Sequence, residues 1–427
     1  MENRYEKYKD SGIAWIGEIP EHWDVCKLST LFFQHKQKNS GSQEINLLSL
    51  SYGNIKRKDI NTLEGLLPES FENYNIIDRD DIVFRLTDLQ NDKKSLRSAL
   101  CKERGIITSA YVTIRKRTNI NPIFFNYLFR SYDECKVFYG LGDGVRQGMN
   151  FDDLRNLDVL LPQQTIQQYI ATYLDQKCDE IDELIALQEE MITKLQSYKQ
   201  SVITEVVTKG LDKNASLKDS GIEWIGEIPM HWKICKLKNI FLLSTGTTPK
   251  GFDKISEEDN LINWYTPSDI LDSCNDLFSS QRKLSEQVIE ENGISLFPVG
   301  TLMYVGIGAS AGKLGYANES GYSNQQITGL IPFNCYSKFY FYYLSGLKEK
   351  IRDNAFFTTL PIINNAYLGQ ELIPYPPMSE QQTIVDYLDQ KCSEIDELIS
   401  IKQQKIEKLK DYKKSLIFEC VTGKRKV

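Results

Sequence analysis

The chain has 427 residues, of which 41% are hydrophobic and 26% charged, a composition typical of folded globular domains. Lys and Arg total 51 against 58 Asp and Glu, and the net charge of −7 argues at face value against a nucleic-acid-binding protein. Apolar runs fall far short of the roughly 18 residues of a membrane span, and the polar N-terminus has no signal-peptide pattern. We therefore expect neither membrane insertion nor secretion.

The cysteines and histidines indicate a protein without a metal centre. The nine cysteines contain no Cys-x-x-Cys pair, and the chain has only three histidines. This pattern favours reduced thiols in a cytoplasmic protein. Few positions remain for a histidine-based metal site or a catalytic triad, so we expect no metal ion and no cofactor.

An internal repeat begins near the N-terminus. Residues 9–23 return as 218–232 with 13 of 15 positions identical, and residues 173–185 return as 387–399 with 12 of 13 identical. The stretches between these segments differ almost throughout. Uniform drift after a duplication would change the repeated segments and the stretches between them to a similar extent. The pattern therefore favours one repeated frame that carries two different recognition domains, which we call the inserts. We expect the aromatic residues of the frame to pack each domain against the helices, rather than to act in catalysis: Trp15, His22 and Trp23, with their copies Trp224, His231 and Trp232.

The first domain, residues 1–160, contains a basic cluster. Residues 93–117 carry eight Lys and Arg against Glu103 alone, a local net charge of +7, and a second cluster occupies residues 56–58. A charge run is more often a solvated face, but basic side chains can hold phosphates while short polar ones reach base edges. The DNA-binding candidates here are Ser51, Tyr52, Lys56, Arg57, Lys58, Lys93, Lys94, Arg97, Arg115, Lys116 and Arg117.

A long helix is predicted in residues 161–210, and a second one in residues 375–427. Neither proline nor glycine interrupts residues 165–208 or 379–422, and both stretches show apolar residues at heptad-like steps. Two such helices most simply pair with each other as an antiparallel coiled coil, which would relate the halves by a pseudo-twofold axis. The expected seam is Leu174, Ile181, Leu184, Met191, Leu195, Tyr198 and Val202 with Ile384, Leu388, Ile395, Leu398, Leu409, Tyr412 and Leu416.

Identical polar residues on the two helices are expected to face outward. Two copies of one partner would require such a repeated surface, although a solvated face inherited by duplication explains it equally well. The partner-binding candidates are Asp175, Gln176, Glu180 and Glu183, with their copies Asp389, Gln390, Glu394 and Glu397.

The second domain, residues 211–374, offers polar turn-forming segments at the start of its insert. Residues 245–250 and 264–269 are rich in Thr, Ser and Pro, a composition that suits contacts in a DNA groove. The candidates taken from them are Thr247, Thr248, Lys250, Thr266 and Ser268.

Three near matches to catalytic motifs are better explained as structure. Asn121-Pro122-Ile123-Phe124 lacks the second proline of the Asn-Pro-Pro-aromatic motif of amino-methyltransferases, and it predicts a helix start. The segment 306–314 is one residue too long for a phosphate loop, and Leu314 replaces its Ser or Thr, so a turn between strands fits better. Glu134-Cys135-Lys136 is a weak nuclease candidate with no obvious Asp partner. A fused enzyme is therefore disfavoured, and the divergent inserts with their basic cluster disfavour a scaffold without a DNA role.

The order of these segments resembles the DNA-specificity subunits of type I restriction–modification systems. The segment 220–232, present twice, is similar to the start of each half of such subunits. The segment 376–389 with its long heptad helix is similar to the end of each half. The first copy departs from the pattern at Ile166, where Glu380 stands in the second, which predicts a weaker helix cap. Further similarity to target recognition domains at residues 308–315 and 324–325 adds Lys313, Asn324 and Gln325 to the DNA-binding candidates.

The resemblance implies a mixed α/β fold with two globular target recognition domains, separated by two long helices that pair as an antiparallel coiled coil. It implies a non-catalytic subunit in which each domain reads one half of a split, asymmetric double-stranded DNA target. The helices would set the spacer and dock two copies of the methyltransferase subunit, and the restriction–translocase subunits would join that complex.

The net charge is consistent with this assignment once it is divided by region. Residues 1–160 sum to zero, 161–210 and 211–374 to −4 each, and 375–427 to +1. We expect so acidic a chain to bind DNA weakly by itself and to need basic partner subunits around the duplex.

Overall fold

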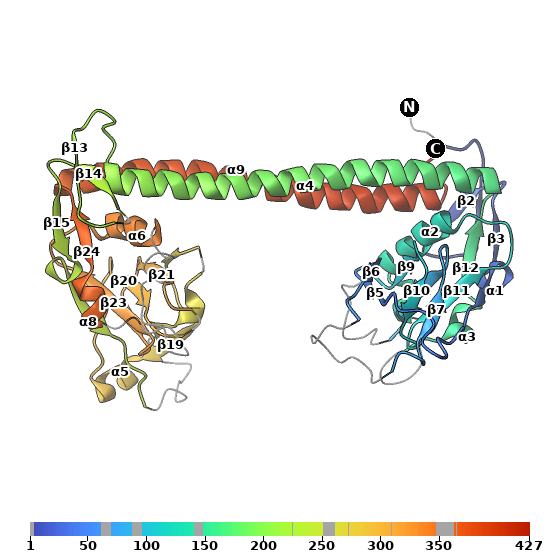
Figure 1. The fold of residues 1–427 in the computed structure, drawn as a ribbon, viewed down its shortest axis with the longest axis horizontal. Helices are drawn as coiled ribbons and strands as arrows, with labels where there is room; N and C mark the ends of the chain where they lie inside the picture. Colours follow the sequence, from blue (N-terminus) through green and yellow to red (C-terminus); the bar gives the residue numbers. More distant parts are fainter. Residues whose placement is uncertain are drawn as a thin grey trace. The chain divides into compact units, whose positions relative to one another are not determined.

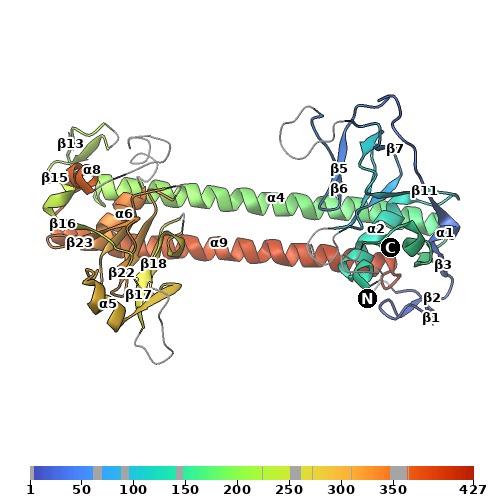
Figure 2. The same cartoon turned by 90° about the horizontal axis from the view of Figure 1, so that it is seen from below.

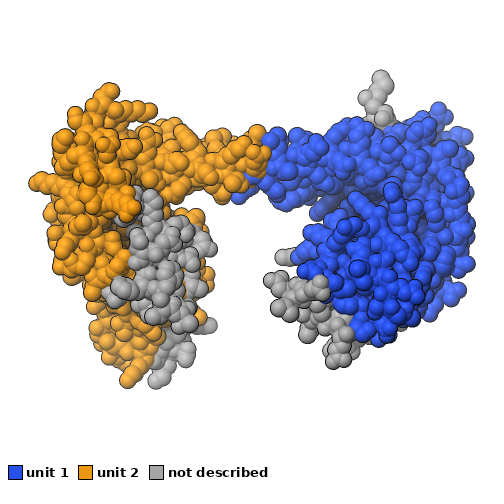
Figure 3. All heavy atoms as spheres, viewed as in Figure 1, with its two compact units in different colours: residues 1–189, 403–427 blue, residues 190–402 orange. Residues whose placement is uncertain are grey.

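A computed structural model describes residues 4–60, 70–87, 96–140, 148–223, 225–250, 261–271, 273–308, 310–346, 363 and 365–427. The candidates Lys93, Lys94 and Trp224 lie outside these residues. Within them, no helix is long and apolar enough to cross a membrane. The chain divides into two compact units, which Figure 3 shows in different colours: unit 1 comprises Met1–Glu189 and Gln403–Val427, and unit 2 comprises Glu190–Lys402.

Unit 1 combines short antiparallel strands with one packed helix (Figure 1). Its largest described sheet has the order β4-β11-β8-β9, and smaller pairs are β1-β2, β12-β3, β10-β7 and the hairpin β5-β6. The strands are β1 (Tyr8–Asp10), β2 (Glu18–Pro20), β3 (Asp24–Lys27), β4 (Phe32–Gln34), β5 (Leu48–Ser51), β6 (Asn54–Arg57), β7 (Asn75–Ile77), β8 (Ile82–Phe84), β9 (Ser98–Leu100), β10 (Gly105–Ile107), β11 (Val112–Lys116) and β12 (Asp158–Leu161). The helices are α1 (Leu28–Leu31), α2 (Pro122–Glu134), the 3-10 helix η1 (Val137–Gly140), α3 (Phe151–Leu154) and the first part of α4 (Gln164–Lys209).

Helix α2 begins where the sequence predicts. The Asn121 side chain accepts hydrogen bonds from the backbone N–H groups of Ile123 (2.9 Å) and Phe124 (3.2 Å), and Pro122 occupies the first turn. The helix packs an aromatic face on the sheet, with the Phe125 ring 5.3 Å from Phe32. The Asn-Pro segment is therefore a helix cap, as predicted.

Unit 2 is a mixed sheet structure with its own aromatic helix. A five-stranded sheet of order β16-β23-β20-β21-β18 lies with a three-stranded sheet β19-β17-β22, in which β17 and β22 are parallel, and with the pairs β13-β14 and β15-β24. The strands are β13 (Leu217–Asp219), β14 (Glu227–Pro229), β15 (Lys233–Lys236), β16 (Phe241–Thr245), β17 (Leu261–Tyr265), β18 (Asn275–Leu277), β19 (Arg282–Ser285), β20 (Leu302–Val305), β21 (Leu314–Ala317), β22 (Tyr322–Ser323), β23 (Ile327–Pro332) and β24 (Leu372–Tyr375). The helices are η2 (Leu237–Asn239), η3 (Pro267–Asp269), α5 (Glu286–Asn292), α6 (Ser337–Gly346), α8 (Asn365–Gln370) and part of α9 (Met378–Val421).

The segment 306–313 connects β20 to β21, which pair antiparallel, and so it is the turn that the sequence predicts.

The two inserts differ in sequence, but each is closed by an equivalent strand pair. Each unit contains a segment of α4 beside a segment of α9 (Figure 2), and a strand pair lies just before the start of one of these helices. In unit 1, β3 pairs with β12 just before α4, and in unit 2, β15 pairs with β24 just before α9 (Figure 1). The two ends of each insert are thereby closed by one strand pair.

The repeated segment packs on the end of a long helix in each unit. Trp23 and Trp232 are fully buried. The glycines that follow the helices, Gly423 after α9 and Gly210 after α4, both have a φ of +73°. A Cβ at Gly423 would lie 2.3 Å from Pro20 Cδ, and one at Gly210 would lie 3.4 Å from Trp232 Cζ2. The expected role of these tryptophans as packed anchors is confirmed.

One position distinguishes the two anchors. In unit 2 the Glu380 carboxylate, in the first turn of α9, accepts hydrogen bonds from Trp232 Nε1 (3.0 Å) and His231 Nε2 (2.8 Å). The equivalent residue in unit 1 is Ile166, and Trp23 Nε1 has no hydrogen-bond partner among the described residues. The predicted weaker start of the first long helix therefore has a structural counterpart: the carboxylate that accepts the hydrogen bond of the buried indole in unit 2 is missing in unit 1.

The seam of the long helices differs from the one expected. Leu184, Tyr198, Leu398 and Tyr412 are 44–56% exposed. The most covered side chains instead follow the series 178, 181, 185, 188, 192, 195, 199, 202 on α4 and the equivalent series 392 to 416 on α9, at alternating steps of three and four residues. The prediction assigned Leu184 and Leu398 to the seam because they are leucines. The buried series instead includes polar residues such as Gln188, and a pattern of apolar residues alone does not detect these positions.

Each unit contains one copy of a polar clamp beside this seam. In unit 1, Lys413 Nζ on α9 lies 2.6 Å from Asp182 on α4; in unit 2, Lys199 Nζ on α4 lies 2.7 Å from Asp396 on α9. Early α4 and late α9 share one apolar cluster in unit 1, as late α4 and early α9 do in unit 2. The helix segments within each unit therefore run antiparallel.

The Glu380 contact supports a stability prediction. We expect Glu380→Ile to lower the free energy of unfolding by about 1–3 kcal/mol, because it leaves a buried indole N–H unsatisfied, as in unit 1. Urea titration followed by circular dichroism measures the change. The matched control is Glu205→Ile, an exposed helix position of the same unit. Equal losses in the two variants would refute a specific role for the indole–carboxylate bond.

Candidate nucleic-acid and partner interfaces

The hairpin β5-β6 presents a polar face on unit 1. Its two-residue turn, Tyr52-Gly53, has positive φ at both positions (46° and 73°), the conformation of a tight hairpin turn. Arg130 of α2 donates to the carbonyl of Gly53 (2.8 Å) and holds the tip in place. Tyr52 is 70% exposed there. The hairpin therefore carries an exposed aromatic ring on an anchored tip.

Cross-strand register sorts the side chains of this hairpin onto two faces. Leu48 and Leu50 pack into a buried cluster, so the alternate residues face outward. The pairs Ser49↔Lys56 and Ser51↔Asn54 share that outer face. The structure thus brings the candidates Ser51, Tyr52 and Lys56 together and adds Ser49 and Asn54, which alternation along a strand could have revealed. Lys58 follows β6 and is exposed.

Several described residues of the basic clusters form ion pairs inside unit 1. Arg57 is ion-paired with Glu103, and Lys116 Nζ lies 3.9 Å from Asp80. The Arg115 guanidinium lies 2.7 Å from both Asp78 and Asp81. Arg104 also pairs with Asp78, and Arg117 donates to the carbonyl of Phe32 (3.2 Å). Among the described residues of the run, Arg104, Arg115 and Lys116 are therefore paired with acids from outside it.

Arg97 is a structural residue. It is fully buried, its backbone N–H donates to the Asp133 carboxylate, and its guanidinium donates to the carbonyl of Thr87 (3.1 Å). Burial raises the pKa of Asp133 to about 6. The expectation that Arg97 contacts DNA is not supported by this structure, because the side chain is fully buried and its guanidinium is engaged by Thr87 and Tyr139.

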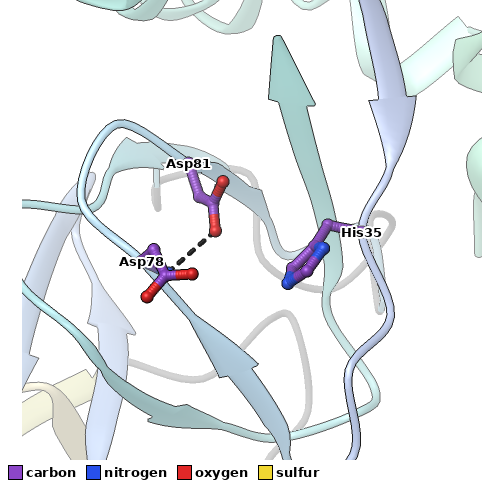
Figure 4. Close-up of side chains that lie close together, drawn as sticks. All are labelled: His35, Asp78 and Asp81. Carbon is purple, nitrogen blue, oxygen red and sulfur yellow. Dashed lines mark hydrogen bonds between the residues drawn. The ribbon is translucent and has the colours of Figure 1, made fainter. Parts of the chain in front are cut away.

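The one cluster of metal-ligand type in the described residues belongs to this ion-pair network. His35 points toward Asp78 and Asp81 (Figure 4), and ligand atoms of the three lie within 4.8 Å of one another. Burial opposes ionisation of Asp78, but hydrogen bonds from Arg115 and Arg104 outweigh it and lower its pKa. Because guanidinium groups already neutralise both carboxylates, the cluster does not fit a divalent cation.

In unit 2, parallel strands bring several candidates to one edge. The register Trp264↔Tyr322 and Tyr265↔Ser323 places the ends of β17 and β22 side by side, so residues 266–268 and 324–326 leave the same edge. The segment after β16 joins them, because the backbone N–H of Thr247 donates to the carbonyl of Ser323 (2.7 Å). The hydroxyl of Thr248 donates to Gln325. Gly246 permits this approach, since a Cβ there would lie 2.1 Å from Ser323 Oγ.

The remaining candidates of unit 2 have mixed positions. Thr266 is only 6% exposed, and its hydroxyl donates to Asp269 (2.8 Å), so it caps the short helix η3 and is not available to DNA. Ser268 is exposed beside it. Lys250 is exposed after the Thr247-Thr248 turn, and the half-buried Lys313 lies 3.4 Å from the carbonyl of Ile270.

A surface pocket of about 360 Å³ opens beside this edge. Its polar lining includes four residues that were not among the predicted candidates, Thr245, Gln326, Thr328 and Asn365. Gln326 directly continues the Asn324-Gln325 pair, and that run of amides was the available signal. The full lining is Thr245, Gly306, Ile307, Gln325, Gln326, Thr328, Ile363, Asn365 and Ala366.

The long helices carry a repeated exposed stripe. Its shared features are a tyrosine, a Lys–Glu pair and two apolar residues at helical spacing. In unit 1, Lys177 Nζ lies 2.6 Å from Glu180; in unit 2, Lys391 Nζ lies 2.7 Å from Glu394. The four apolar side chains are 44–52% exposed. We define the stripe as Tyr173, Lys177, Glu180, Leu184 and Leu187 in unit 1, and Tyr387, Lys391, Glu394, Leu398 and Ile401 in unit 2.

The partner-binding candidates divide on this surface. Gln176 and Gln390 donate to Glu180 (2.9 Å) and Glu394 (3.0 Å), so both pairs adjoin the stripe. Glu183 and Glu397 are exposed nearby.

Two further candidates are used inside the units. Asp175 accepts a hydrogen bond from Tyr127 of α2 (2.8 Å), and Asp389 accepts one from Tyr342 of α6. These two carboxylates hold each insert on its helix, which corrects their expected role as outward-facing contacts.

The structure thus combines two unlike mixed α/β units, each with an exposed polar edge and one copy of the repeated helix surface. Comparisons with known proteins indicate the class of protein that has this organisation. Residues 229–411 match the family described as type I restriction modification DNA specificity domain. A Methanocaldococcus jannaschii chain, named as the MjaX type I restriction enzyme specificity subunit, is 25% identical over 431 residues, 96% of each chain. The MjaIX specificity subunit of that organism is 31% identical over 188 residues, 43% of this chain and 42% of that one.

Solved structures share the fold. A chain from a study of complex assembly and conformational transition of the type I R-M system has a TM-score of 0.71 at 17% identity, covering 95% of this chain and 99% of that one. The HsdS subunit from Thermoanaerobacter tengcongensis has a TM-score of 0.52 at 17% identity, covering 95% and 98%. The expected mixed α/β fold is confirmed.

The chain is therefore similar over almost all of its length to type I restriction–modification specificity subunits, and residues 229–411 match the DNA specificity domain of that family. These comparisons bear out the resemblance that the sequence predicts.

The hairpin face supports a binding prediction. We expect Lys56→Ala to weaken DNA binding by the assembled complex for all sequences alike, and to reduce the slope of log Kobs against log salt by about 1, because one phosphate contact is lost. Titrations at several salt concentrations measure it, with the exposed Lys9→Ala as control. An unchanged slope for Lys56→Ala would remove the hairpin from the DNA surface.

Proposed function

We propose that this subunit reads a bipartite, asymmetric DNA target, one half with each recognition domain. The recognition domains are residues 1–160 and 211–374, and the long helices lie in 161–210 and 375–427. The helices set the spacer between the half-sites and dock two copies of the methyltransferase subunit. Restriction–translocase subunits join that assembly.

Divergence confined to the inserts supports two different half-sites. The polar edges differ in kind: unit 1 presents a hairpin face with Ser51, Tyr52 and Lys56, whereas unit 2 presents Thr248, Gln325 and Gln326 at strand ends. Surfaces so unlike in shape and hydrogen-bonding groups suit different base sequences.

The repeated stripe is the observation that carries the partner proposal. Side chains of the same kind recur at all five positions, and the Gln–Glu and Lys–Glu contacts recur within about 0.1 Å. Four apolar side chains half exposed on helices indicate a surface that another protein covers. Two equal stripes suit two equal partners.

The helices also suit a spacer role. α4 spans 46 residues and α9 spans 44. At about 1.5 Å per residue, each helix is roughly 65–70 Å long, and the antiparallel segments in each unit support pairing as a coiled coil. The electrostatic part of binding is shared with the partners, because the net charge is −7 and Arg57, Arg104 and Arg115 of unit 1 are ion-paired.

Domain exchange tests the bipartite reading. Replacing residues 29–160 with the corresponding segment of another specificity subunit is expected to change one half of the target, because unit 2 keeps its own reading edge. The target is determined by mapping modified bases in cells that express the chain with its methyltransferase partner. A change in both halves would contradict independent reading by the two domains.

Charge reversal on the stripe tests the docking. We expect Lys177→Glu and Lys391→Glu each to remove one methyltransferase subunit, and the double variant to remove both, because each substitution places two acidic groups side by side on one stripe. Native mass spectrometry of the purified complex counts the copies. The control pair is Lys194→Glu with Lys408→Glu, equivalent exposed positions outside the stripe. Retention of both partners by the double variant would place the docking surface elsewhere.

A further inference from the structure

The amide of Gln326 has a fixed orientation at the edge of unit 2. Its backbone N–H donates to Oδ1 of Asn324 (3.1 Å), which identifies that atom as oxygen, because a backbone N–H can only donate. The other end of the Asn324 amide is therefore a donor, and Nδ2 donates to Gln326 Oε1 (3.1 Å). The Gln326 carbonyl is thus used inside the unit, and its NH2 group faces away from that contact.

Gln325 lies next to Gln326 in the chain and places its Oε1 on the hydroxyl of Thr248, so that its NH2 group is on the other side of the amide. Both glutamines are exposed, and within the described part of the chain neither Nε2 donates to another group. The strand ends therefore display two adjacent NH2 groups whose carbonyls are occupied.

The pocket beside them does not compete for these donors. Thr328 donates to Asn365 Oδ1 (2.6 Å), and Asn365 Nδ2 donates to Thr245 Oγ1 (2.9 Å), so the polar groups of the pocket wall satisfy one another. The unsatisfied hydrogen-bonding groups lie with the glutamines at the rim.

We propose that Gln325 and Gln326 determine specificity in the half-site of unit 2 by donating hydrogen bonds to O6 and N7 of a guanine in the major groove. Guanine presents two neighbouring acceptors there, which match two NH2 donors, whereas adenine presents one acceptor and one donor and matches only one of them. Lys250, exposed on the adjacent segment, is placed to hold a phosphate next to the base. This inference rests on the proposed function and identifies the base that one edge reads.

The test uses the full chain, expressed with its methyltransferase partner in cells that lack other DNA modification. Modified bases are mapped for the unaltered chain and for Gln326→Glu. Glutamate keeps an oxygen toward Asn324 but replaces the outward donor with an acceptor. Gln370→Glu, an exposed position on α8, controls for the added negative charge. Exchange of residues 211–374 assigns the half-site that unit 2 reads.

We expect a guanine in that half-site, and Gln326→Glu to reduce the preference for it by roughly 5- to 150-fold, the range for one bidentate contact. The other half-site, the spacer and the Gln370→Glu pattern stay unchanged. In the purified complex, 7-deazaguanine at that position should weaken binding by the unaltered chain but no longer by Gln326→Glu.

Three outcomes would overturn the inference: a unit 2 half-site without guanine, an unchanged target in Gln326→Glu, or a change at a position that is not guanine. Absence of any modified motif with the unaltered chain would instead count against the proposed function, so the two failures are distinguishable.

Discussion

Both units depend on the packing of an indole ring against the glycine that ends a long helix. Gly423 and Gly210 share a φ of +73°, which stops the helix, and the missing Cβ allows Pro20 with Trp23, or Trp232, to approach closely. In unit 1 this contact joins the first residues of the chain to the last ones. A unit can therefore form only when segments remote in sequence meet, and the repeated segment is the part of the chain that makes them meet.

The seam of the helices shows how burial overrides an apparent heptad. Leu184 and Leu398 have the character of seam residues, yet they are 44% and 47% exposed, whereas Gln188 is buried. Placing leucines outside the seam costs hydrophobic burial in the isolated chain. Under the proposed docking, a partner subunit would cover these leucines and recover that burial.

In unit 1, a run of basic residues in the sequence does not form an equally basic surface in the fold. Eight basic residues in 93–117 indicate a strongly positive patch. The fold brings Asp78 and Asp81 against Arg115, and Asp78 also pairs with Arg104. Few of the described candidates remain on the hairpin, which is consistent with the proposal that hydrogen-bonding edges and partner subunits contribute more to DNA affinity than the charge of this chain.

The sequence by itself determined the repeat, the two long helices, the family resemblance and the helix start at Asn121, because each depends on local propensity or on residues repeated in order. It also located Gln325 and Thr248, although not their contact. Only the tertiary structure decided which candidates remain accessible. Arg97 and Thr266 became buried and Asp175 turned inward, while Gln326 joined the reading edge. The reason is physical: exposure and pairing of a side chain are set by segments distant in sequence, such as β22 beside β17, and no local pattern encodes which segments those are.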